Sequence, residues 1–294
     1  MSNDAVVLMA YGSPERLADV PAYYADIRGG RPIGPEHLDD LVERYRRLGI
    51  EDSSPLNAIT EQTRAALEQE LELPVFTGMK HWTPRIGDAA KSALDAGAQT
   101  IVGLVLAPHY SVLSIQGYRE QLERALEGRA ELRFVDSWHD EPGFVEFLAA
   151  RVRGTRAHVV FTAHSLPARI LELGDPYREQ LLETSRLIAE AAGTERWSFS
   201  FQSESPTGEP WLGPDILDHL RALHEQGVGS VLICPVGFVS DHLEIRWDLD
   251  VEAVELAKEL GLSLERIEMP NNDPAFVRTL AGIVKRHLAV PSPA

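Results

Sequence analysis

Residues 158–167, His-Val-Val-Phe-Thr-Ala-His-Ser-Leu-Pro, carry the pattern that decides the fold class. The run is continuously apolar and rich in β-branched residues, which predicts a strand that is buried on both faces. It ends in a short turn that closes on a proline. Residues 6–14, Val-Val-Leu-Met-Ala-Tyr-Gly-Ser-Pro, repeat the same plan. Each half of the chain therefore opens with the same kind of strand.

Strands and helices alternate outward from these two runs. Further short aliphatic runs occur at 75–77, 100–106 and 230–234, and apolar residues recur at helical spacing in 59–71, 86–94 and 181–191. We predict an α/β fold of two similar Rossmann-like lobes, residues 1–152 and 153–294, whose parallel sheets are flanked by helices. The sequence leaves open on which of the two lobes the final helix, 274–288, packs. Ligands lie beyond the carboxyl ends of such strands, so we expect the active site in the interlobe cleft.

Composition excludes several classes of protein. The chain has 294 residues and a formal charge of −17, which argues against binding to nucleic acid or to an anionic membrane. Its single cysteine, Cys234, excludes an internal disulfide and a Cys-only zinc or iron–sulfur site within one chain. No apolar run approaches the ~20 residues of a spanning helix, and the first residues lack the basic start of a secretory signal. We expect a cytoplasmic protein.

The stretch 240–252 is rich in carboxylates. Asp241, Glu244, Asp248 and Glu252 are spaced 3, 4 and 4 residues apart, which places them on one face of a helix. At a rise of ~1.5 Å per residue, neighbours stand roughly 5–6 Å apart along the axis. Oxygen ligands in such a row suit a hard divalent cation or a path that hands a cation inward. A solvated acidic face is the alternative interpretation.

His164 follows a strand that has no reason to be exposed. A neutral imidazole at this place can accept a proton or bind a metal, although a buried, hydrogen-bonded histidine is the alternative. Paired with Glu244 across the expected cleft, it could remove protons from a weak N–H acid while a metal enters.

Two further groups of residues point to the same cleft. Tyr11 ends the first strand, and the apolar segment 110–115 could form the lip of a pocket for a flat apolar ligand or could simply pack between the lobes. Arginines gather in an otherwise acidic chain, where they could hold an acidic substrate or make ordinary surface salt bridges. They are Arg28, Arg31, Arg44, Arg46 and Arg47.

Eight short motifs, in order along the chain, resemble the signatures of ferrochelatases. They cover nearly the whole sequence, and their order is more specific than any one of them. The motifs are Met9-Ala10-Tyr11-Gly12-Ser13-Pro14, Ser54-Pro55-Leu56, Gly78-Met79-Lys80-His81, Ala163-His164-Ser165-Leu166-Pro167, Gly174-Asp175-Pro176-Tyr177, Gln202-Ser203, Trp211-Leu212-Gly213-Pro214 and Val239-Ser240-Asp241-His242-Leu243-Glu244.

The resemblance implies a chelatase-like fold and the insertion of ferrous iron into a porphyrin. By position, His164 and Glu244 match the catalytic, iron-binding pair. Asp248 and Glu252 match an outer cation site or metal route, and the resemblance implies Mg²⁺ as a candidate ion for that outer site. Tyr11 matches the position that distinguishes the coproporphyrin branch. Residues that match porphyrin-binding positions are Tyr11, Arg28, Arg44, Tyr45, Ser54 and Tyr118; Lys80 and His81 match a cleft motif of less certain role.

The resemblance also sets expectations for cofactors and partners. Iron is a substrate, no cofactor is required, and one cysteine cannot supply the iron–sulfur cluster that some relatives carry. The acidic chain stops soon after its last helix, which favours coproporphyrin III and no membrane contact. A monomer with transient contact to a coproheme decarboxylase is implied. The alternatives are a protoporphyrin IX ferrochelatase, a cobaltochelatase acting on a sirohydrochlorin-type ring and a porphyrin or heme carrier; a metal-dependent hydrolase ranks last.

Overall fold

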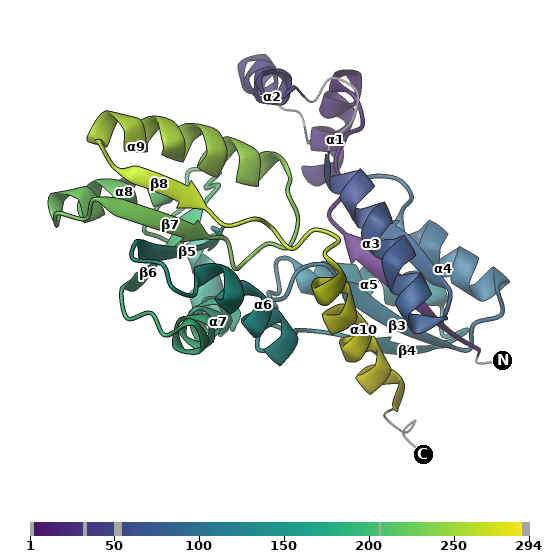
Figure 1. Ribbon diagram of the computed structural model, residues 1–294. Helices are drawn as coiled ribbons and strands as arrows, with labels where there is room; N and C mark the ends of the chain where they lie inside the picture. The colour runs from purple at the N-terminus through teal and green to yellow at the C-terminus, as the bar shows by residue number, and fades with distance from the viewer. Residues whose placement is uncertain (1–2, 32–33, 50–54, 206, 290–294) are drawn as a thin grey trace.

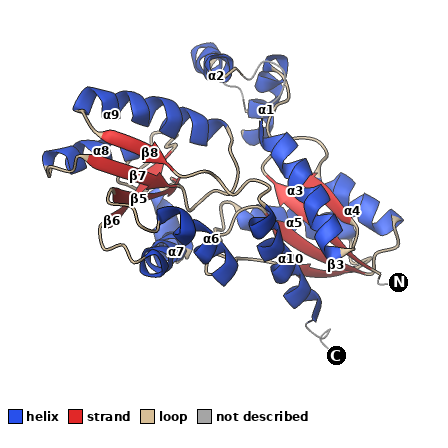
Figure 2. Cartoon of the chain, in the orientation of Figure 1, coloured by secondary structure: helices blue, strands red, loops and turns tan. Residues whose placement is uncertain are grey.

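The computed structural model describes residues 3–31, 34–49, 55–205 and 207–289. In these residues the strands form two four-stranded, fully parallel sheets (Figures 1 and 2). The first sheet has the order β2-β1-β3-β4 and the second β6-β5-β7-β8, so the two lobes share one topology. The strands are β1 (Asp4–Ala10), β2 (Val75–Met79), β3 (Thr100–Val105), β4 (Glu131–Phe134), β5 (His158–His164), β6 (Trp197–Gln202), β7 (Ser230–Cys234) and β8 (Ser263–Arg266).

Helices connect the strands and cover the sheets. The α-helices are α1 (Val20–Ile27), α2 (Pro35–Arg47), α3 (Pro55–Leu71), α4 (Ile86–Asp95), α5 (Ile115–Leu126), α6 (Pro142–Val152), α7 (Tyr177–Ala192), α8 (Ile216–Glu225), α9 (Val254–Leu260) and α10 (Pro274–Ala289). Two 3₁₀ helices (Leu17–Asp19 and Ala168–Leu173) and a π-helix, η3 (Ile245–Ala253), complete them. The expected strands and helices at 6–10, 59–71, 75–77, 86–94, 100–106, 158–162, 181–191 and 230–234 are all present.

The central strands are buried on both faces because their side chains alternate between two apolar layers. In β1, Val7 and Met9 pack with α4 and α5, whereas Val6 and Leu8 face α3 and α10. In β5, Val160 joins a layer formed with α8 and η3, whereas Val159 and Phe161 face the opposite way. Most side chains inside these central strands are apolar, so we expect the functional groups at the strand ends.

One apolar layer runs through both lobes. It contains Val6 and Leu8 from the first sheet, Val159 and Phe161 from the second, and side chains of α6, α7 and α10 between them. Helix α6 packs on α7 and α10, and α10 also packs on α3 and β3 (Figure 1). The last helix therefore returns to the first lobe, a choice that the sequence left open.

The fold predicts opposite effects for two glycine-to-alanine changes. A Cβ on Gly237 would lie 2.5 Å from Cβ of Ala163, on the strand that ends at His164. We expect Gly237→Ala to lower the free energy of unfolding by about 1–3 kcal/mol through overpacking. Gly282 lies in α10 with its nearest neighbour 3.7 Å away. We expect Gly282→Ala to raise stability by about 0.5–1 kcal/mol. Urea titrations measure both; a Gly237→Ala protein as stable as the parent would contradict the packing.

Candidate functional site

His164 and Glu244 meet, as the sequence predicted, but both belong to the second lobe and do not face each other across the interlobe cleft. His164 is the last residue of β5, and Glu244 directly precedes η3 in the segment that follows β7. Nε2 of His164 lies 3.4 Å from Oε1 of Glu244, and the side chains remain 29% and 37% exposed. The strands β5 and β7 are neighbours at the point where the strand order reverses, which is where ligands bind in open α/β sheets.

The two side chains form an ion pair in the free protein. Burial disfavours the imidazolium, but the charge and hydrogen bond of Glu244 outweigh it and raise the pKa of His164 to about 9. Burial likewise opposes the carboxylate, yet the charge and hydrogen bond of His164, helped by His242, hold the pKa of Glu244 well below its usual range. At neutral pH His164 therefore already carries a proton and is not the neutral imidazole considered from the sequence.

The backbone around His164 fixes its ring. Nδ1 donates to the carbonyl of Ser165, which leaves Nε2 directed at Glu244. The hydroxyl of Tyr177, in the first turn of α7, donates to the carbonyl of His164 at 3.0 Å. These two contacts hold the strand end and the ring together.

A second histidine, His242, stands on the other side of Glu244. Its Nε2 is 3.4 Å from Oε2 of Glu244, and its Nδ1 donates to the carbonyl of Ser240 at 2.9 Å. Sequence reasoning gave His242 no role, although it lies two residues before Glu244. The carboxylate is thus flanked by two imidazoles.

The acidic row contains three members rather than four. Glu244, Asp248 and Glu252 follow one another at the start of η3 and along it, but the helical residues begin only at 243. Asp241 lies before them, and its carboxylate instead accepts from Arg266 at 3.2 Å and from Asn271 at 2.9 Å. An arginine and an amide thus hold this carboxylate outside the row.

Asp248 is the buried member of the row. Burial raises its pKa to about 7, with smaller contributions from Glu244 and Glu252, against the hydrogen bond from Ser203. The amide of Gln202 donates to Asp248 and to the carbonyl of Glu244, each at 3.4 Å. Thr162 donates to the oxygen of the same amide at 3.0 Å, which orients its nitrogen toward η3.

The sequence also predicted metal-binding roles for residues of this acidic row. Within the described ranges, no three His, Cys, Asp or Glu side chains are grouped so that they could hold a metal ion. The outer Mg²⁺ or metal-route role of Asp248 and Glu252 stays a prediction.

Tyr11, in the first lobe, lies near enough to the pair for the charge of Glu244 to act on its hydroxyl. It follows β1, is 42% exposed, and its ring centroid lies 4.6 Å from that of His81. Burial of its hydroxyl, followed by the charge of Glu244, raises the pKa of Tyr11 above its usual value. His81 in turn bonds Asp26 at 2.8 Å, which Arg85 also holds.

The helical pair α1–α2 reaches across to the second lobe. Arg44 lies over the ring of Trp247, on η3, with 5.3 Å between the guanidinium carbon and the ring centroid. Tyr45 is buried in a cluster against which Leu243 packs. Arg47 lies over the same ring and pairs with Glu255 at 3.3 Å.

The remaining predicted porphyrin-binding residues differ in their exposure and in their contacts. Arg28 is exposed at the end of α1, and Ser54 lies outside the described residues. Tyr118, on α5, is buried, and Nζ of Lys80 lies 4.7 Å from its ring centroid. Lys80 also donates to the carbonyl of Ser114 at 3.1 Å.

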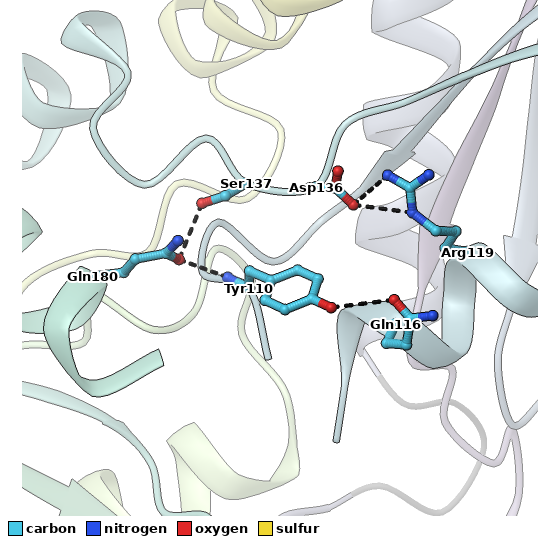
Figure 3. A pocket seen from close by; sticks show the side chains of 6 residues that line it. All are labelled: Tyr110, Gln116, Arg119, Asp136, Ser137 and Gln180. Atoms are coloured by element: carbon cyan, nitrogen blue, oxygen red, sulfur yellow. Dashed lines mark hydrogen bonds and ion pairs between the residues drawn. The ribbon is translucent and has the colours of Figure 1, made fainter. Parts of the chain in front are cut away.

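A cavity of about 440 Å³ opens elsewhere at the junction of the lobes (Figure 3). Its polar groups are paired with one another, Arg119 with Asp136 and Tyr110 with Gln116. The cavity does not include the residues of the His164–Glu244 pair; its lining is Tyr110, Gln116, Arg119, Asp136, Ser137 and Gln180.

No helix in the described parts of the chain combines the length and apolar character that a bilayer crossing requires.

Comparison with known proteins agrees with this geometry. Residues 3–288 match the family model described as Ferrochelatase. A ferrochelatase of Deinococcus radiodurans is 44% identical over 97% of this chain and 96% of its own. A coproporphyrin III ferrochelatase of Halalkalibacterium halodurans is 42% identical over 97% of both chains.

A solved structure supports the fold. SirB from Bacillus subtilis with Fe³⁺ superposes with a TM-score of 0.63 over 98% of this chain and 96% of that one, at 12% identity. The two lobes share one topology, and a histidine and a glutamate pair at the topological switch point. Together with the family match over nearly the full length, these features place this chain in the ferrochelatase family.

Proposed function

We propose that this ferrochelatase inserts Fe²⁺ into coproporphyrin III to form coproheme in heme biosynthesis. The observation that carries the proposal is the position of Tyr11 directly after β1, at the carboxyl edge of the first sheet, where the charge of Glu244 reaches its hydroxyl from the other lobe. The resemblance associates a tyrosine at this place with the coproporphyrin branch. A relative that is 42% identical is named a coproporphyrin III ferrochelatase, which supports the same choice.

The chemistry of insertion suits the paired residues. A free-base porphyrin carries two pyrrole N–H protons, and both must leave as the metal enters. Distortion of the ring would expose the nitrogen lone pairs and lower the barrier. His164 accepts one proton while Glu244 guides Fe²⁺ or takes the other. Because His164 is an imidazolium at rest, its own proton must leave before it can act as a base. The positive charge of arriving Fe²⁺ favours that loss.

Three alternative functions can be distinguished from this one. The Deinococcus relative is named simply a ferrochelatase, so protoporphyrin IX is the nearest alternative substrate. SirB is similar in fold alone, and cobalt insertion into a sirohydrochlorin-type ring would need a different metal preference. A carrier would bind porphyrin without converting it.

We propose further that the protein acts as a monomer in the cytoplasm and passes its product to a decarboxylase.

Substrate choice is measured directly. We expect iron insertion with Fe²⁺ to proceed faster on coproporphyrin III than on protoporphyrin IX, and Co²⁺ with sirohydrochlorin to be a poor pair. Steady-state absorbance assays of each combination measure the preference. A higher kcat/KM on protoporphyrin IX would reject coproporphyrin III as the substrate.

His164→Ala should abolish insertion while porphyrin still binds, because the change removes the base but none of the residues expected to hold the ring. We expect a loss of at least about 100-fold in kcat, as is usual for a general base. Fluorescence quenching measures binding. His224→Ala, on an exposed helix end, is the matched control. Near-normal turnover in His164→Ala would remove the assigned role.

The ion pair predicts a titration. A folded-state pKa of about 9 lies above the ordinary 6.5, so His164 stays protonated through neutrality and loses its proton as the pH rises through 9. Its contribution to stability is therefore present below pH 6.5 and is lost between 6.5 and 9. In Glu244→Gln only burial and the weaker contacts remain, so the pKa of His164 should fall. NMR of ¹⁵N-labelled histidine follows both; an unchanged midpoint in Glu244→Gln would contradict the pairing.

A further inference from the structure

A loop of the first lobe is bonded along helix α7 of the second. We call residues 107–114, between β3 and α5, the rim loop. Nε2 of His109 lies 2.9 Å from the hydroxyl of Thr184, and the amide of Tyr110 donates to Gln180 at 2.7 Å (Figure 3). The next two residues bond Asp175, which lies two residues before the first residue of α7 and is 6% exposed.

Asp175 is the centre of this contact. Oδ2 accepts from the hydroxyl of Ser111 at 2.9 Å and from the amide of Val112 at 2.7 Å. The Ser111 oxygen in turn accepts from the amide of Leu113 at 3.2 Å. One carboxylate oxygen therefore fixes the backbone of two successive residues, directly at Val112 and through a hydroxyl at Leu113.

The residues held in this way are unusual for their exposure. Val112 and Leu113 are apolar, yet 41% and 38% exposed. The loop ends at Ser114, whose carbonyl binds the Lys80 that lies over Tyr118. The rim loop is thus linked through Lys80 to Tyr118, and its exposed apolar pair suits contact with the face or edge of a flat macrocycle.

The other carboxylate oxygen of Asp175 faces the catalytic histidine's strand. Oδ1 accepts from the amide of Tyr177 at 2.9 Å, and the hydroxyl of Tyr177 donates to the carbonyl of His164. Three hydrogen bonds thus lead from Val112 to His164 through one buried carboxylate. These contacts join residues that are 52 positions apart in the sequence (164 − 112).

We propose that Asp175 is a positioning residue for porphyrin binding, which sets Val112 and Leu113 of the rim loop at a fixed place relative to His164. The inference rests on the proposed function in that the ligand is a porphyrin, but it does not depend on which porphyrin. Neither the ion pair nor the acidic row on η3 includes Asp175.

Asp175→Asn separates the two roles of the carboxylate. An asparagine oxygen can still accept from the amide of Tyr177, since asparagine caps helices well. Its NH₂ group then faces the rim loop, where the Ser111 hydroxyl can turn to accept but the amide of Val112 loses its acceptor. We expect KM for the porphyrin to rise about tenfold, equivalent to ~1.4 kcal/mol, with kcat within about twofold of the parent.

Ser111→Ala provides a second, milder variant. It removes the bond from the Ser111 hydroxyl to Asp175 and, with it, the link to Leu113, while Val112 keeps its acceptor. We therefore expect a rise in KM of about threefold, smaller than for Asp175→Asn. The double variant should fall short of the product of the two single effects, because both changes act on one connected set of bonds. Asp218→Asn, which removes an exposed carboxylate paired with Arg221, is the control and should leave KM unchanged.

The measurements are steady-state KM and kcat and the porphyrin dissociation constant, each normalised to folded protein, with the porphyrin that the parent converts faster. An unchanged KM in Asp175→Asn, or a kcat that falls with thermal stability while KM stays constant, would overturn the proposal. Effects that multiply in the double variant would do the same. If Asp175→Asn does not fold, the KM of Ser111→Ala decides. A preference for protoporphyrin IX would reject the substrate proposal and leave this one standing.

Discussion

The apolar layer shared by the two sheets is the constraint on which the rest of the molecule depends. Val6 and Leu8 of one lobe and Val159 and Phe161 of the other contribute to a single cluster. Because buried side chains pack at the density of a crystal, the lobes cannot shift independently without opening voids. Distances between residues of different lobes, such as those around Asp175, are therefore properties of the fold rather than of a loose contact.

The sequence predicted the central strands and missed most of the edges. β1, β3, β5 and β7 lie inside their sheets, so both faces must be apolar and the run is visible in the sequence. β4 (Glu-Leu-Arg-Phe) and β8 (Ser-Leu-Glu-Arg) are short edge strands that carry charges, as exposed edges commonly do. β6 alternates serine with aromatic residues and is also an edge. Pairing with a neighbouring strand makes these segments strands, and their own composition does not show it.

The candidate site was likewise predictable only in part from the sequence. His164 and Glu244 were found because the turns after parallel strands gather at one edge, which a sequence pattern can show. The ionisation of His164 was not, since it depends on a 3.4 Å contact between distant segments that outweighs burial. Asp241 was assigned to the wrong set for a similar reason. Its partners, Arg266 and Asn271, lie 25 and 30 residues away and nothing local marks them.

The return of α10 to the first lobe means that the chain crosses between the lobes twice, once through α6 and once through residues 267–273. A swing of one lobe about a single linker is then not available. Asn271 lies on the second crossing and binds the backbone and carboxylate of Asp241, three residues before Glu244. The start of the segment that carries Glu244 is therefore tied to the second crossing, which makes its position depend on how the chain returns to the first lobe.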